Sequence, residues 1–232
     1  LLFLEDPGFR RDDGYSKIKA MIKSHNKKQQ LKQAESLHKA KQLDEAIALY
    51  QEILKDEPQN VPALHFCAMA YFEKGALEEA EKGFQDVLKR IPTFAEAHFY
   101  LSQIAYKRGD VKTALDILEK AQGAGVIHLK LLSFQADLYR ESQAYEKALL
   151  LAEQILSKVP ENIDALMCKG LCLIELKREI EAIAVFKKTV EIDPAFVKGY
   201  INIGATIILA YEDCEAALPY FDKALSLDPQ NA

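Results

Sequence analysis

The sequence predicts an all-α protein, an α-solenoid built from antiparallel helix pairs. Three observations lead to this prediction: prolines recur at one spacing, small residues recur at two fixed positions between them, and a bulky residue recurs at a third. Pro58 and Pro92 lie 34 residues apart, Pro92 and Pro160 twice that distance, Pro160 and Pro194 again 34, and Pro194 and Pro229 35. A fixed period of this length is typical of helical repeat proteins.

Placing these prolines at position 32 of a 34-residue unit divides most of the chain into six repeat units. The units are 27–60, 61–94, 95–128, 129–162, 163–196 and 197–231. The third has Val126 at the proline position, and the sixth carries one extra residue near Tyr211. One such unit is too small to bury its apolar surface alone, so we expect neighbouring units to stack into a continuous core.

Each unit is expected to form two helices whose backbones approach closely. Position 8 is always small and position 20 is always alanine, whereas position 24 is large or apolar in most units. Small residues allow the close approach, and the bulky residue fills the space beside them. Position 8 is Ala34, Ala68, Ser102, Ala136, Gly170 and Gly204; position 20 is Ala46, Ala80, Ala114, Ala148, Ala182 and Ala217; position 24 is Tyr50, Phe84, Leu118, Ala152, Phe186 and Phe221.

Glycine and proline define the ends of the expected helices. Gly75 and Gly109 are expected to end the first helix of their units as C-caps. The proline of each unit ends the second helix, because proline cannot continue one. In "GAGV" (123–126) the two glycines could form a hinge, but simple helix termination is the favoured interpretation.

The stretch "AMAYFEKGALEEAEKGFQDVLKRIP" (68–92) resembles the tetratricopeptide repeat motif. The resemblance extends over residues 27–231 and comprises six units in phase. It implies a right-handed superhelix whose first helices line a concave groove, and a function as a protein interaction scaffold. The expected ligand is a peptide or helix of another protein.

The resemblance also directs attention to positions 2, 5, 9 and 12 of each unit, which form a second stripe on the first helix. This stripe gives two apolar or aromatic patches with charged residues between them. Aromatic residues and methionine are enriched at recognition surfaces. The alternative is that these side chains pack against neighbouring helices as core. The candidate groove residues are His65, Met69, Phe72, Phe99, Gln103 and Tyr106, then Asp137 and Arg140, then Met167, Leu171, Ile174 and Ile201.

Some members of the family that the sequence resembles hold the acidic C-terminal tails of heat-shock chaperones in a clamp of lysine and asparagine side chains. Leu31, Glu35 and His65 stand where such a clamp would need basic or amide groups. The sequence therefore argues against that ligand.

No pattern in the sequence indicates catalysis, a cofactor or a metal ion. The five histidines are scattered, and none of the four cysteines forms a Cys-x-x-Cys pair, so buried packing is the expected role of the thiols. We therefore expect a protein that is not an enzyme. Two alternatives remain open: a repeat arm of a larger glycosyltransferase or methyltransferase, and a self-assembling structural protein.

Charge is unevenly distributed. Residues 1–42 hold ten Lys and Arg against five Asp and Glu, whereas the remainder holds 20 against 30. Residues 1–26 do not fit the repeat and are expected to form an N-terminal extension or capping helix, and membrane contact could arise only through this basic segment. Nucleic-acid binding is disfavoured because no reading motif accompanies the charge. Localisation is not determined, although unpatterned thiols favour the cytoplasm.

The second helix of the sixth unit carries an apolar face that no polar capping helix follows. Solenoid ends normally need such a cap. We therefore expect this C-terminal face to be covered by further repeats, another domain or another molecule, with self-association as one possibility. The face consists of Leu218, Phe221, Ala224 and Leu225.

Overall fold

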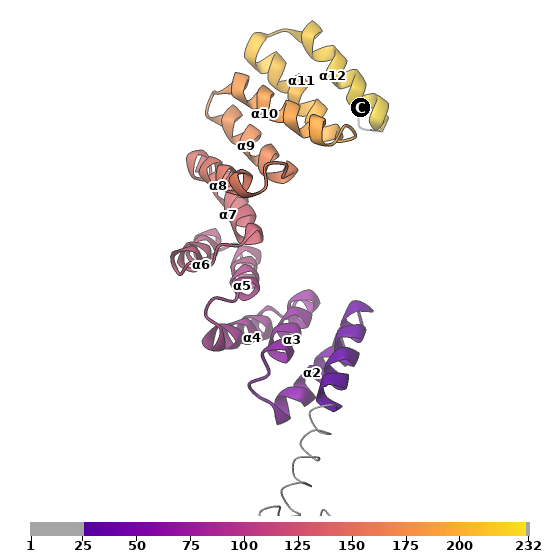
Figure 1. The fold of residues 1–232 in the computed structure, drawn as a ribbon, viewed down its shortest axis with the longest axis vertical. Coiled ribbons are helices and arrows are strands. Elements are labelled where there is room, and N and C mark those ends of the chain that lie inside the picture. The colour runs from indigo at the N-terminus through magenta and orange to yellow at the C-terminus, as the bar shows by residue number, and fades with distance from the viewer. Residues whose placement is uncertain (1–25, 231–232) are drawn as a thin grey trace, which may run out of the picture. The chain divides into compact units, whose positions relative to one another are not determined.

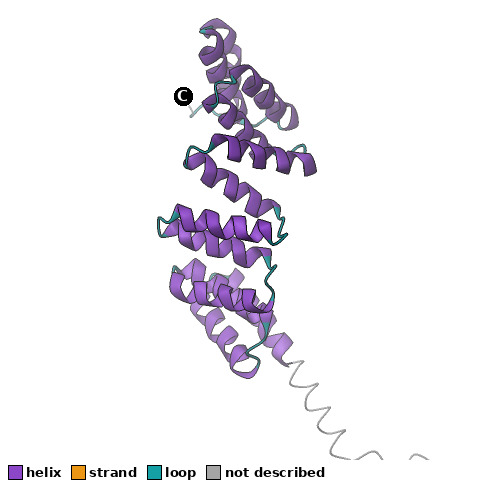
Figure 2. Cartoon of the chain, turned by 90° about the vertical axis from the view of Figure 1, so that its left-hand side faces the viewer, coloured by secondary structure: helices purple, strands orange, loops and turns teal. Residues whose placement is uncertain are grey.

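A computed structural model describes residues 26–230, and all regular secondary structure in that range is helical (Figure 1, Figure 2). A helix at 26–39 precedes α2 (Leu43–Asp56), α3 (Val61–Lys74), α4 (Leu77–Arg90), α5 (Ala95–Lys107), α6 (Val111–Gly123), α7 (Leu129–Glu141), α8 (Tyr145–Lys158), α9 (Ile163–Glu175), α10 (Glu179–Ile192), α11 (Val197–Tyr211) and α12 (Cys214–Leu227). The predicted all-α fold of consecutive helix pairs is confirmed. The predicted N-terminal extension lies, apart from its last residue, outside the described residues.

The recurring small residues lie where two helices meet. All six alanines of position 20 are fully buried, and the residues of position 8 are buried as well. The aromatic rings of Phe84 and Phe186 at position 24 are also fully buried. At Gly170 an added Cβ would lie 2.3 Å from Cε1 of Phe186, so only glycine fits beside this ring. The period thus reflects close packing between helices.

Asparagine side chains explain part of the recurring junction sequence. The phrases "EPQN" and "VPEN" each end in the residue that caps the next helix. Asn60 Oδ1 accepts a hydrogen bond from Ala63 N at 3.0 Å, and Asn162 Oδ1 accepts one from Ala165 N at 2.8 Å. The proline therefore ends one helix and the asparagine begins the next.

The turn inside each helix pair contains a residue with positive φ. Gly75 is the C-cap of α3 with φ of 86°, as predicted. The C-cap of α5 is Arg108, one residue earlier than predicted, and Gly109 follows it with φ of 81°. The corresponding turns elsewhere use residues with side chains, namely Lys41, Gln143, Lys177 and Glu212, with φ between 55° and 62°. This conformation favours glycine, because a Cβ crowds the following carbonyl group.

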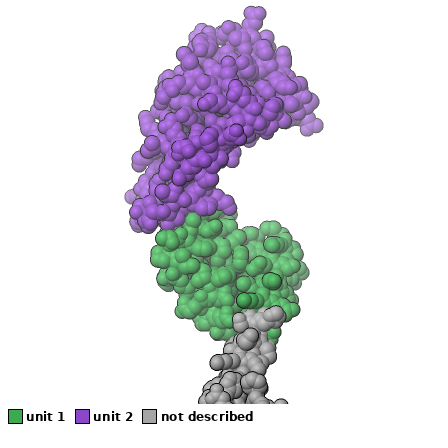
Figure 3. All heavy atoms as spheres, in the orientation of Figure 1, with its two compact units in different colours: residues 1–108 green, residues 109–232 purple. Residues whose placement is uncertain are grey.

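The chain divides into two compact units, residues 1–108 and 109–232 (Figure 3). The division falls in the turn between α5 and α6, inside the predicted unit 95–128, and the sequence analysis did not predict it. In the first unit, helix 26–39, α2 and α3 share one apolar cluster around Tyr50. In the second, helices α7 to α12 share a larger one that includes Cys168 and Cys172.

Helix α6 ends at the two glycines of 123–126, as predicted. The helix stops at Gly123, Gly125 has φ of 81°, and the amide of Val126 donates to the carbonyl of Ala121 at 2.9 Å. Val126, which replaces the junction proline, is buried. Between residues 26 and 230, no helix has both the length and the apolar character needed to cross a bilayer.

Candidate functional site

Four of the predicted groove residues line a single cavity in the second unit. They are Asp137 and Arg140 of α7 and Met167 and Leu171 of α9. The cavity has a volume of about 690 Å³, within the range typical of ligand pockets. Its remaining walls come from α7, α9, α11 and two junctions: Ser133, Asp164, Cys168, Asp193, Ala195, Phe196, Val197, Lys198 and Asp228.

The apolar part of this cavity is supported by the core beneath it. Met167 and Leu171 are half-buried and pack against the buried cluster of the second unit. Asn202 Nδ2 lies 3.9 Å from the Met167 sulfur and steadies it from α11. Phe196 adds a half-buried aromatic ring from the junction before α11. An apolar side chain of a ligand would therefore meet a preformed surface.

The polar part of the cavity is predominantly acidic. Four aspartates line it, against two cations, Arg140 and Lys198. Arg140 Nη2 lies 3.8 Å from Asp137 Oδ1, and both side chains remain partly exposed. Partial burial raises the pKa of Asp137 above its usual value, Arg140 counteracts this, and Asp164 raises it further. The cavity is thus suited to ligands that combine an apolar group with hydrogen-bond donors or positive charge.

Ile174 and Ile201 do not line this cavity. Ile174, on α9, is half-buried and packs against the apolar core of the second unit. Ile201, on α11, is half-buried too. For Ile174 the structure therefore favours the alternative interpretation of the stripe, a packing role.

In the first unit, the predicted aromatic residues join a cluster of rings. Phe72 lies edge-on to Tyr100 with ring centroids 5.2 Å apart, and Lys107 Nζ lies 4.7 Å above the Phe72 ring. Phe99 also meets Tyr100, at 5.6 Å. Gln103 is half-buried on the same helix. Tyr106 is exposed to 37%, and Met69 lines a separate cavity described below.

His65 is buried, contrary to the expectation that it faces an open groove. Only 8% of it is exposed, because rings from α3, α4, α5 and the junction between α4 and α5 surround it. The nearest is Phe94, with centroids 4.9 Å apart. Burial lowers the pKa of His65, although Glu96 partly opposes this. A neutral imidazole in an aromatic cluster has a packing role and is not accessible to a ligand.

Sequence reasoning missed the junction residues of the second unit's cavity, Asp193, Phe196 and Asp228. The prediction considered only the first helix of each unit. A signal was nevertheless present, because "EIDPAF" and "SLDPQN" share an aspartate directly before the junction proline. Asp193 Oδ1 accepts from Ala195 N at 2.9 Å, and Asp228 Oδ1 accepts from Gln230 N at 3.2 Å, so both carboxylates are held in place. Within residues 26–230, no three acidic, histidine or cysteine side chains are placed to hold a metal ion.

Comparison with known families agrees with the repeat pattern. One tetratricopeptide repeat model matches residues 37–92, and a second matches residues 68–125 and 135–195. The chain belongs to the tetratricopeptide repeat family. Members of this family are generally protein-binding modules.

Two curated proteins resemble the chain over most of its length. The "Tetratricopeptide repeat and J domain-containing co-chaperone DNJ1" of Fusarium oxysporum f. sp. lycopersici is 25% identical over 195 residues, which cover 81% of this chain and 37% of the relative. The "DnaJ homolog subfamily C member 7 homolog" of Dictyostelium discoideum is 27% identical over 209 residues, covering 89% and 35%. The chain thus spans about a third of the length of these relatives.

A solved tetratricopeptide repeat structure shares the fold. YrrB, described as "a TPR protein with an unusual peptide-binding site", aligns with a TM-score of 0.66 and 22% identity. The alignment covers 78% of this chain and 93% of YrrB. At this identity the similarity shows the fold alone.

Proposed function

We propose that the chain is a non-catalytic scaffold that binds a peptide or helix of a partner protein within a larger assembly. The observation that carries this proposal is the cavity of the second unit, in which Met167 and Leu171 lie beside Asp137 and Arg140. Apolar anchors supply most of the affinity at such sites, and charges at the rim mainly set selectivity and association rate. That a family member is described as having a peptide-binding site supports the same interpretation.

The ligand is expected to place an apolar side chain against Met167, Leu171 and Phe196. Polar or cationic groups next to that side chain would meet the aspartates. Arg140 would donate hydrogen bonds to an acidic group of the same segment, because its contact with Asp137 is long and exposed. A segment that alternates apolar and charged residues satisfies all three demands.

The test begins with a phage-displayed peptide library selected against the full chain. A selected peptide is then labelled, and its affinity is measured by fluorescence polarisation for Leu171→Ser and Arg140→Glu. We expect Leu171→Ser to weaken binding by about tenfold or more, because it removes an anchor. Arg140→Glu should change which of the selected peptides binds best.

Two variants serve as matched controls. Leu150→Ser makes the same change at a leucine on α8 that is exposed and outside the cavity, and Lys188→Glu reverses a charge on the exposed side of α10. Both should bind as the unchanged chain does, and circular dichroism must show that all four variants are folded. Equal affinity of Leu171→Ser and Leu150→Ser, together with an unchanged peptide preference of Arg140→Glu, would contradict the assignment of this cavity.

The proposal that the chain itself is not catalytic has its own test. A screen for hydrolase and transferase turnover should find none that one side-chain substitution abolishes. Turnover lost in such a variant would favour the alternative that the chain is part of an enzyme.

A further inference from the structure

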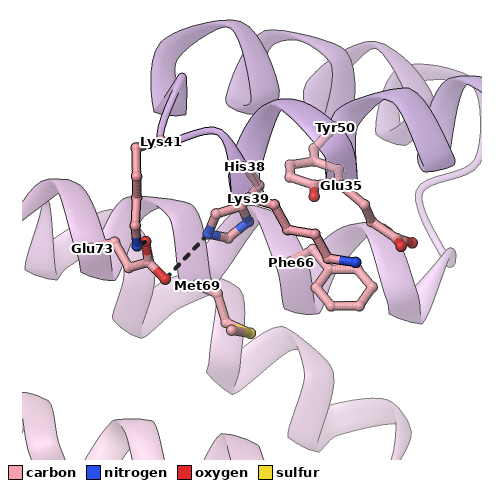
Figure 4. A pocket seen from close by; sticks show the side chains of 8 residues that line it. All are labelled: Glu35, His38, Lys39, Lys41, Tyr50, Phe66, Met69 and Glu73. Atoms are coloured by element: carbon pink, nitrogen blue, oxygen red, sulfur yellow. Dashed lines mark hydrogen bonds and ion pairs between the residues drawn. The ribbon is translucent and has the colours of Figure 1, made fainter.

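A second cavity lies entirely within the first unit and shares no residue with the proposed peptide site. Its volume is about 340 Å³, sufficient for one large amino-acid side chain. The walls come from helix 26–39, the turn after it, α2 and α3 (Figure 4). Phe66 and Met69 form its apolar side, and Glu35, His38 and Glu73 contribute polar groups.

Tyr50 is the feature of this cavity that most needs an explanation. The residue is fully buried, yet its hydroxyl has no hydrogen-bond partner among residues 26–230. Figure 4 shows the hydroxyl directed toward the side on which Phe66 and Met69 lie. A buried hydroxyl without a partner destabilises a fold, whereas phenylalanine would fill the same space without this cost. An unsatisfied hydroxyl facing a cavity points to a ligand that forms a hydrogen bond with it, and the hydroxyl oxygen can accept one from a cationic donor.

The half-buried Phe66 ring offers a flat surface in the same cavity as this hydroxyl. The Tyr50 and Phe66 rings are stacked, with centroids 6.2 Å apart and planes inclined by 24°. The His38 ring lies edge-on to the Tyr50 ring, with centroids 6.3 Å apart. Planar cations bind to such faces because the ring quadrupole is negative above and below the plane.

The two carboxylates of the cavity differ in their partners. Glu73 is held by Lys41 Nζ at 2.8 Å, whereas His38 Nε2 lies 3.4 Å from the other carboxylate oxygen without a hydrogen bond. Glu35 makes no ion pair with any residue between 26 and 230 and is half-buried. The remaining cation of the wall, Lys39, is exposed, so its amine can stay in water while its stem covers the cavity. Among residues 26–230, Glu35 is therefore the carboxylate of this cavity that forms no ion pair.

We propose that this cavity binds an arginine side chain of a partner protein segment. The guanidinium stacks on the Phe66 ring, donates to the Glu35 carboxylate and donates to the hydroxyl oxygen of Tyr50. Arginine fits better than lysine, because it is planar, donates in several directions and is more weakly hydrated. Rotation of the flexible Lys39 and Met69 side chains admits it. This site does not depend on the cavity of the second unit.

The methionines of the chain make a direct test possible. There are three, of which Met69 lines this cavity and Met167 lines the cavity of the second unit. The full chain is labelled with ¹³C-methyl methionine, and the Met69 signal is assigned with Met69→Leu. The probe is a capped pentapeptide whose only charge is that of its central arginine, acetyl-Gly-Ala-Arg-Ala-Gly-amide. Its control is the same peptide with citrulline, which keeps the shape but lacks the charge.

We expect the arginine peptide to shift the Met69 methyl signal in a saturable manner and the citrulline peptide to leave it unchanged. Glu35→Gln should weaken the arginine peptide by about tenfold, because it removes a charge-assisted bond. Tyr50→Phe should weaken it by about threefold or more while the chain remains folded. Glu78→Gln, the same change at an exposed position of α4, should have no effect.

The opposite results are equally clear. The proposal is wrong if Met69 responds equally to both peptides, if it shows no saturable shift, or if Glu35→Gln and Tyr50→Phe bind as the unchanged chain does. A saturable shift of Met167 alone would support the second unit's cavity and overturn this one. The two signals therefore separate the failure of this inference from the failure of the proposed function.

Discussion

Tyr50→Phe and Tyr139→Phe are the same chemical change, and the structure predicts opposite effects on stability. Tyr50 is fully buried and its hydroxyl is unsatisfied among the described residues. Tyr139 is also buried, but its hydroxyl donates to Glu119 Oε1. Burial, together with this bond, raises the pKa of Tyr139 to about 12, so the phenol stays protonated and donating at neutral pH.

The expected magnitudes follow from these contacts. Leaving a buried hydroxyl unpaired costs about 1 to 3 kcal/mol. Removing the Tyr50 oxygen leaves a small void that destabilises the fold by roughly 0.5 kcal/mol. The net effect of Tyr50→Phe should therefore be a stabilisation of about 1 kcal/mol. Tyr139→Phe loses a hydrogen bond to a carboxylate, and because Glu119 is exposed and can be hydrated instead, the loss should be about 1 kcal/mol.

Urea denaturation followed by circular dichroism at 222 nm measures both effects. With slopes of about 2 kcal/mol per molar urea, the two midpoints should move by about 0.5 M in opposite directions. If Tyr50→Phe lowers the midpoint as much as Tyr139→Phe does, the Tyr50 hydroxyl has a stabilising partner and the reasoning about the first unit's cavity fails.

Three further predictions concern packing, pH and association. Gly170→Ala should destabilise the chain by about 1 to 3 kcal/mol, because the new Cβ would clash with the buried Phe186 ring. Gly123→Ala has open space around it and should stabilise the helix by up to about 1 kcal/mol. The urea denaturation midpoints of the two variants test both expectations. Because burial lowers the pKa of His65 below its usual 6.5, its contribution to stability is present above pH 6.5 and is lost as the pH falls through the lowered value. The loss on going from pH 7.5 to pH 5 should therefore be smaller in His65→Leu than in the unchanged chain, and an equal loss would show that other groups cause it. Leu218 of α12 is 55% exposed. If the apolar face of α12 mediates self-association, Leu218→Ser should reduce the average mass measured by sedimentation at high concentration. An unchanged mass distribution would contradict self-association through this face.

The repeat period made the fold predictable because its main signal is local. Position 20 and position 24 lie one turn apart on the same face of the second helix. The spacing of residues such as Ala80 and Phe84 in the sequence is therefore enough to place them in the core of their helix pair. The same reasoning placed helix ends at Gly75 and Gly109, where φ is positive. These features need no knowledge of distant contacts.

The site was predictable only in part, because it depends on neighbours from several units. Of the residues in the stripe, Asp137, Arg140, Met167 and Leu171 line one cavity, and their role in binding stays a prediction. The stripe misplaced His65, since rings from two later helices and a junction enclose that side chain. The cavity of the first unit was not predicted, because one of its lining residues is Tyr50, at position 24 of the first unit. The repeat pattern indicates only a packing role for that position.

The division at residues 108 and 109 was not predicted either. The period continues through this point without interruption, since Gly109 occupies the turn that Gly75 occupies one unit earlier. Sequence periodicity reports that repeats are present. It does not give the interaction free energy between successive repeats, which depends on the side chains at their interface.

The four turn residues with side chains and positive φ have a consequence for local opening. Each holds a conformation that costs about 1 kcal/mol relative to glycine, and in repeat proteins such a cost acts mainly on its own hairpin and its neighbours. Hairpins that turn at Gln143, Lys177 and Glu212 should therefore exchange their amide hydrogens sooner than the hairpin that turns at Gly75. Lys41 differs from these three, because its amine holds Glu73 at the edge of the first unit's cavity. Glycine at position 41 would slow the local opening of the first hairpin, but it would also remove the ion pair with Glu73. The same residue therefore affects both the stability of the hairpin and the negative charge in its cavity.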